Sequence, residues 1–183
     1  MIKNTIIISL LFFALVSCNQ DLTREDVIKL IDSDKYINLK GADLEGVDLS
    51  SLDLHRSDLS EANLRGADLR HCDLSYSDLN GTTLVDAILE NADLEGVDLY
   101  GANLSKASLI DANLWRANLY GANLSYANLS YADLSRTILE NADLRGANLH
   151  RSDLSEANLR GADFTDTDLS GADLTNVIGF KKP

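Results

Sequence analysis

Carboxylates are the most numerous side chains of this 183-residue sequence that could do chemistry. Asp and Glu number 29 against 16 Lys and Arg, for a formal charge of -13, and 15 of these acids are Asp at one position of a five-residue spacing. Acids at such regular intervals could attract a hard cation such as Ca²⁺. The other candidates are three His and two Cys. A chain this acidic is a poor direct ligand for nucleic acid, because phosphate backbones are bound by cationic side chains.

No set of these residues forms a recognisable catalytic arrangement. The abundant serines are not paired with a His base and an orienting acid, and no GxxxxGK sequence followed by Ser or Thr is present to cradle a phosphate. The sequence therefore predicts neither an enzyme nor a bound cofactor. With 45% hydrophobic residues, the chain can still bury the core of one domain.

Residues 1–17 have the composition of a secretory signal. One charge, Lys3, precedes an apolar run over residues 6–16, which is too short for a membrane span of roughly 20 residues. The sequence Leu15-Val16-Ser17-Cys18 resembles the lipobox of bacterial lipoprotein precursors. This resemblance implies cleavage before Cys18, acylation of that residue, and membrane attachment through it, with residues 18–22 as the tether. We expect a lipoprotein of the bacterial envelope, on the outer-membrane or periplasmic side; an ordinary cleaved signal is the alternative.

From residue 39 to residue 174, every fifth residue is Leu, except Phe164. Calling the Leu position i, most i−2 residues are small, most i−1 residues are Asp or Asn, and ten of the eleven glycines lie at i+2. A period of five forms no stripe on a helix and alternates faces on a straight strand. The chain must therefore turn once per repeat, which directs i−2 and i inward and places i+2 at a corner. This pattern indicates a solenoid.

Units such as Gly101-Ala102-Asn103-Leu104-Ser105 resemble the pentapeptide-repeat family. The resemblance implies an all-β fold, a right-handed quadrilateral β-helix over residues 35–178 with four repeats per coil and about seven coils. Periodicity alone does not distinguish four sides from three.

Both ends of such a solenoid need covering. Thr23 is a predicted N-cap, with Leu22 and Val27 as a hydrophobic staple and acids in the first turn, so residues 23–34 are expected to form a short capping helix. At the other end, residues 179–183 are expected to form a C-terminal tail, and Val177, Ile178 and Phe180 could fold over the last coil. We favour this covering because the ends of a solenoid need caps; the alternative is pairing with a second subunit, since C-terminal dimerisation is known in the family that the chain resembles.

Four repeats per coil would stack each residue on the one twenty positions later. In one such column, Asp residues repel each other and could attract Ca²⁺, but in the resembled family this position mainly supports the corner backbone. The histidines share no neighbouring positions, which argues against a His-based metal site. Cys72 lies at an inward i−2 position and is expected to be inert. The column comprises Asp53, Asp73, Asp93, Asn113, Asp133, Asp153 and Asp173, and the histidines are His55, His71 and His150.

Between residues 100 and 131 the i−1 residues are mostly Asn, and the charges are limited to Lys106, Asp111 and Arg116. Large side chains occupy outward positions there and would form an aromatic band around the rod. Aromatic, charge-poor surface is typical of contact sites, although isolated exposed aromatics are common. The possible interaction surface consists of Tyr100, Ile110, Trp115, Tyr120, Tyr126 and Tyr131.

The sequence favours a lipid-anchored, non-enzymatic envelope protein that acts as a rigid acidic scaffold or protein-binding surface for an unknown protein. The alternative is suggested by family members that mimic duplex DNA and bind DNA gyrase. That function requires the cytoplasm, whereas residues 1–18 predict export.

Overall fold

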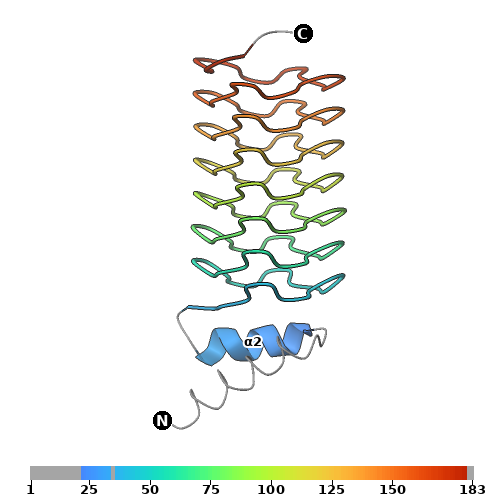
Figure 1. Ribbon diagram of the computed structural model, residues 1–183, viewed down its shortest axis with the longest axis vertical. Helices are drawn as coiled ribbons and strands as arrows, with labels where there is room; N and C mark the ends of the chain where they lie inside the picture. The colour runs from blue at the N-terminus through green and yellow to red at the C-terminus, as the bar shows by residue number, and fades with distance from the viewer. Residues whose placement is uncertain (1–21, 34–35, 181–183) are drawn as a thin grey trace.

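The repeats wind into a rod whose coils lie one above another (Figure 1). The computed structural model describes residues 22–33 and 36–180. Within them the one helix is α2, Arg24–Ser33, which lies against the N-terminal end of the rod. Every other regular contact is an isolated parallel β-bridge, so each side of a coil contributes a single bridge residue instead of a longer strand.

The bridges define a four-sided coil. They join residues twenty apart, beginning with Asn38 and Asp58 and ending with Asn158 and Ile178. Twenty residues contain four five-residue repeats, and the ladder continues through residues 38–178 without an inserted loop. The bridges therefore confirm the predicted quadrilateral β-helix with four repeats per coil.

The interior is built from two positions of each repeat. The Leu side chains from Leu39 to Leu154 have no exposed surface, and the Ala side chains at i−2 beside them are buried as well. Toward the C-terminal end, Leu169 and Leu174 are only partly buried, because they lie in the last coil of the described residues. The sequence pattern placed both inward positions correctly.

A repeat that has Asp or Asn at i−1 and a coil on either side uses all five of its backbone N–H groups, as residues 62–66 illustrate. Ala62 N–H donates across its own corner at 3.0 Å, and Asn63 N–H donates to the preceding coil at 2.9 Å. Leu64 and Gly66 N–H donate to the following coil at 2.7 and 2.9 Å. The N–H of Arg65 is left over, and it donates to the side chain of Asn63 at 3.2 Å. The i−1 side chain is thus needed to complete the backbone hydrogen bonding.

The corners share one unusual backbone conformation. All i+2 residues have positive φ, and 18 of them are residues other than Gly, including Lys106 at 62° and Tyr126 at 60°. A positive φ at the third residue of a four-residue turn defines a type II turn, which favours Gly or Asn there. The sequence predicted that Gly suits this corner, and the structure shows that bulky side chains adopt the same conformation.

The N-terminal end is closed by α2. Thr23 precedes the helix, and its hydroxyl and N–H donate to the Asp26 carboxylate at 2.6 and 3.1 Å, as in a capping box. Leu22 and Val27 are buried against the first coil. The guanidinium of Arg24 donates to the backbone carbonyl of Asp48 at 2.9 Å and so ties the helix to the rod. The predicted capping helix and its N-cap are present, although residue 34 lies outside the described residues.

The C-terminal end is covered only in part. The ring of Phe180 packs edge-on against Phe164, with centroids 5.3 Å apart, and both side chains belong to or pack against the core. Ile178 is 45% exposed. Among the described residues, no helix has the length and apolar character required to cross a membrane.

Candidate functional site

The predicted lipidation site, Cys18, lies outside the described residues, as do residues 1–17. The sites that the structure positions are therefore those on the rod: the acidic columns, the histidines, Cys72 and the aromatic side chains.

The acids at i−1 serve the corners. In every repeat with Asp or Asn at this position, the side chain accepts a hydrogen bond from the N–H two residues later. Ser50, Thr165 and Thr175 add a hydroxyl donor, and these hydroxyl and N–H donors lower the pKa of the carboxyl groups that they contact. The corner-supporting role that the family resemblance implied is present along the whole rod. The accepting side-chain oxygens belong to the Asn and Asp residues at i−1, from Asn38 to Asp173.

Asn and Asp differ in what they do between coils. Where Asn stacks above Asp, its amide donates to the carboxylate below: Asn113 to Asp93 and Asn118 to Asp98, both at 2.9 Å. An Asp in the same place has no proton to donate and adds a second negative charge. Asn therefore relieves the repulsion within an acidic column.

One group of titratable side chains has the spacing of metal ligands. Asp53, His55 and Asp73 each place one ligand atom within 4.8 Å of the others. His55 Nδ1 lies 2.6 Å from the Asp53 carboxylate, and this hydrogen bond lowers the pKa of Asp53. The sequence prediction compared the histidines only with one another, so it did not identify this grouping of one His with two Asp residues. The side chains of Asp53 and His55 are 64% and 48% exposed, so water competes for these atoms.

Cys72 is a structural residue. Its side chain is buried, its Sγ lies 3.1 Å from the carbonyl oxygen of Leu52, and burial raises the pKa of the thiol to about 12. A thiolate is the reactive form of cysteine, so this thiol is inert at neutral pH, as the inward position predicted.

The aromatic band divides among the sides of the rod. Tyr100 and Tyr120 stack with centroids 5.4 Å apart and nearly parallel rings, in the twenty-residue register that the sequence predicted. Tyr126 is 69% exposed at another corner. Of the six candidate residues, Trp115 and Tyr131 line a common hollow.

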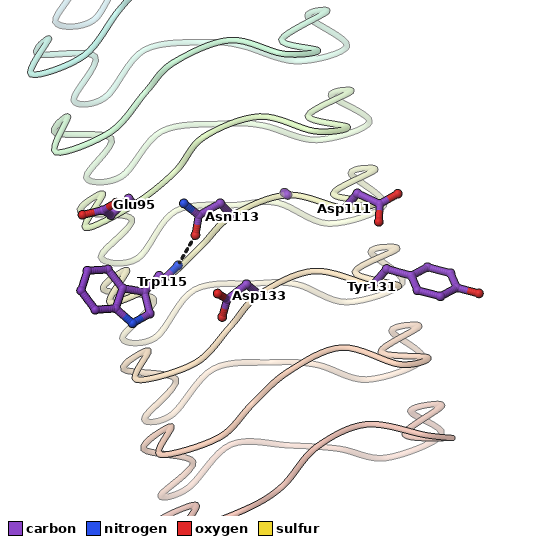
Figure 2. Close-up of a pocket in the computed structure, with 7 residues that line it drawn as sticks. Glu95, Asp111, Asn113, Trp115, Tyr131 and Asp133 are labelled. Carbon is purple, nitrogen blue, oxygen red and sulfur yellow. Dashed lines mark hydrogen bonds between the residues drawn. The ribbon is translucent and has the colours of Figure 1, made fainter.

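This hollow lies on one side of the rod and has a volume of about 480 Å³. Figure 2 shows Glu95 and Trp115 at one edge of that side, and Asp111 and Tyr131 at the opposite edge. Asp133 lies between the edges, one coil beyond Asn113, and Ala112 also lines the hollow. Asn113 accepts the N–H of Trp115 at 3.1 Å and so fixes the backbone at that edge.

The stacking register explains how these residues meet. Asp111 and Tyr131 are twenty apart, as are Glu95 and Trp115, and as are Asn113 and Asp133, which form a bridge. The sequence reasoning singled out the aromatics but not Glu95, Asp111 and Asp133 as their neighbours. The signal was available, because the twenty-residue register places all three pairs around one side once four repeats per coil are accepted.

Comparisons with known proteins give one family and several related structures. The family model "Pentapeptide repeats" matches eight copies over residues 37–75, 67–105, 102–141 and 142–178. The crystal structure of HetL, a pentapeptide repeat protein involved in heterocyst differentiation regulation in the cyanobacterium Nostoc sp. strain PCC 7120, is 32% identical. The alignment covers 86% of this chain and 92% of HetL, with a TM-score of 0.31.

Two further structures are similar over smaller shares or at lower identity. A pentapeptide repeat protein of the Arabidopsis thaliana thylakoid lumen is 36% identical over 56% of this chain and 68% of its own, with a TM-score of 0.36. QnrB1, a plasmid-mediated fluoroquinolone resistance protein, is 21% identical over 78% of this chain and 83% of its own, with a TM-score of 0.44. No protein of curated function matches the chain.

Proposed function

Because the chain belongs to the pentapeptide-repeat family, we propose that it is a non-enzymatic, lipid-anchored protein of the bacterial envelope whose rigid rod serves as a scaffold or protein-binding surface. Proteins of this family are structural or protein-binding scaffolds. The observation that carries the proposal is the aromatic, charge-poor band in the middle of an otherwise acidic rod.

The band has the composition of an interface. Its outward side chains include Tyr100, Tyr126 and Tyr131, which are 50%, 69% and 49% exposed. Interface centres are enriched in aromatic residues and depleted of charge. The backbone beneath is held by hydrogen bonds between coils, so a partner would meet a preformed surface and little ordering entropy would be lost on binding.

The anchor is supported by residues 1–18. The apolar run at residues 6–16 and the sequence Leu15-Val16-Ser17-Cys18 together resemble a lipoprotein precursor. Metabolic labelling with palmitate tests it: the protein should incorporate label and the Cys18→Ala variant should not. An unlabelled wild-type protein would refute the anchor and the proposed localisation.

Crosslinking in the envelope tests the binding surface. We expect crosslinked partners of the wild-type protein to disappear when Trp115, Tyr120 and Tyr126 are replaced together by Ser. These side chains project outward, so circular dichroism should show the same fold in the variant. Retention of every crosslinked partner would refute the band as an interface.

A homodimer through the C-terminal end is a separate proposal. Leu169 and Leu174 are incompletely covered and Ile178 is exposed, so a second copy could bury them. Against it, Phe180 already covers part of this end by packing on Phe164. Light scattering distinguishes a dimer from a monomer whose end is covered by its own residues. A wild-type dimer that Ile178→Asp converts to a monomer supports pairing, and a monomeric wild-type protein refutes pairing.

The alternative function, a DNA mimic that binds DNA gyrase, has weaker support. It rests on the negative charge, but the i−1 carboxylates that carry much of this charge accept corner hydrogen bonds in every repeat where they occur. The charge therefore has a structural origin. Cell fractionation separates the proposals, since a soluble cytoplasmic protein with residues 1–17 intact would favour the mimic.

A further inference from the structure

Three carboxylates and two aromatic rings surround the hollow described above, a combination suited to an organic cation. Glu95 and Trp115 form one edge, Asp111 and Tyr131 form the other, and Asp133 lies between them (Figure 2). We propose that this hollow binds the guanidinium or ammonium side chains of a basic segment of a protein partner. The inference rests on the proposed binding function and specifies the chemistry of the partner.

The carboxylates of the hollow have no ion-pair partner in the described part of the chain, although Glu95 accepts a hydrogen bond from the Tyr76 hydroxyl. Elsewhere on the rod, acids meet cations: Asp143 pairs with Arg145 and Glu156 with Arg136. Over residues 22–33 and 36–180, no ion pair involves Glu95, Asp111 or Asp133. The seven lining residues carry these three negative charges and no positive one, so a basic group is the complementary ligand.

Both rings already accept a guanidinium from this chain. Arg116 lies over the Trp115 ring at 4.2 Å from its centroid, and Arg151 lies 5.9 Å from the centroid of Tyr131. The π-face of an aromatic ring attracts cations, Trp most strongly. Neither arginine lines the hollow. The intramolecular contacts show that the geometry of these rings permits the interaction proposed for a partner.

The shape of the hollow favours a protein segment over a small molecule. The hollow lies on the outer side of the rod, and Figure 2 shows Trp115 and Tyr131 projecting outward from opposite edges. A small ligand binds tightly where a pocket encloses most of its surface. A segment of a partner brings its own covering surface and can place basic side chains against both edges at once.

The single Trp of the chain provides the readout. A peptide of alternating Arg and Gly is titrated into the full protein at physiological salt while Trp115 emission is followed. We expect a saturable change in emission and none with the peptide in which neutral citrulline replaces Arg. Equal responses to the two peptides, or no saturable response to the Arg peptide, would overturn the proposal.

Matched variants separate the hollow from the general acidity of the rod. Replacing Glu95 by Gln and Asp111 and Asp133 by Asn should raise the Kd of the Arg peptide by about tenfold or more, because the three complementary charges are lost.

The control changes the same three repeat positions on other sides and corners: Glu45→Gln, Asp166→Asn and Asp78→Asn. The net charge changes equally, yet Kd should change by less than about twofold. Equal weakening by both triple variants would show non-specific attraction and refute the site. If the Arg peptide fails to bind while envelope crosslinks still depend on the band, only the basic character of the partner is refuted. If the wild-type protein forms no crosslinks that depend on the band, the proposed function itself is refuted.

Discussion

The stacked carboxylates make a quantitative prediction about Asn118. Its amide nitrogen donates to the Asp98 carboxylate in the preceding coil at 2.9 Å, while its oxygen accepts the N–H of Tyr120 at 3.2 Å. Asn118→Asp keeps the acceptor that the corner requires. It removes the donor to Asp98 and places a second carboxylate above the first. We therefore expect the variant to be less stable at neutral pH.

The expected loss has two parts. A hydrogen bond to a charged group contributes about 1.5 to 3 kcal/mol, and partial exposure places this one near the lower value. Repulsion between two partly solvated carboxylates about 5 Å apart adds about 1 kcal/mol. The sum of about 2.5 kcal/mol corresponds to a Tm lower by about 5 to 10 °C for a chain of this length.

Asn128→Asp is the matched control, with the same substitution at the same repeat position. Its neighbours in the column, Ser108 and Asn148, carry no charge, and the amide of Asn148 already donates to Asn128 Oδ1 at 3.1 Å. This variant should change stability by less than about 0.5 kcal/mol.

Thermal and urea unfolding followed by circular dichroism measures both variants. The defect of Asn118→Asp should disappear below about pH 4, where a protonated carboxyl can donate to its neighbour. High salt should restore only the repulsive part. Equal Tm values for the two variants at pH 7 and low salt would refute the account of the acidic columns.

Four further predictions concern buried and strained positions. The buried Ser57 hydroxyl has no hydrogen-bond partner in the described part of the chain, so Ser57→Ala should stabilise by up to about 1 kcal/mol. Ser77→Ala removes a hydroxyl that both donates and accepts, so it should lose about 1 to 3 kcal/mol of stability and unfold at a lower urea concentration; a urea midpoint equal to or above that of the wild-type protein would contradict the assignment. Gly101 has φ of 63° and open space around its Cβ position, so Gly101→Val should lose about 1 to 2 kcal/mol through backbone strain and Gly101→Asn less than half of that; equal melting temperatures would exclude strain. Cys72 should react with a thiol reagent only in urea, because its pKa is raised to about 12, and rapid labelling of the native protein would show that it is not buried.

Much of the fold could be predicted because the repeat is a local signal. Alternation of faces in a short extended segment directs i−2 and i inward whatever the rest of the chain does, and Leu104 and Ala102 are buried as this requires. The N-cap at Thr23 was equally readable, since its bonds to Asp26 span three residues.

Only part of the candidate site could be predicted from the sequence. The outward direction of Trp115 and Tyr131 follows from their positions in the repeat, and so does the stacking of Tyr100 on Tyr120 once the register is accepted. The grouping with Glu95 and the other carboxylates is not a local signal, because it joins residues of neighbouring repeats and neighbouring coils across one side of the rod.

The sequence by itself determined the inside and the outside of this protein and the position of each corner, and the family resemblance implied which side chain supports the corner. Only the tertiary structure decided how many sides the coil has, because that number depends on how far each corner bends and on the bridges between residues twenty apart. The four-sided register in turn places Glu95, Asp111, Trp115, Tyr131 and Asp133 around one hollow. A three-sided coil of the same repeats would stack different residues, since every contact between coils follows from the number of residues in one turn.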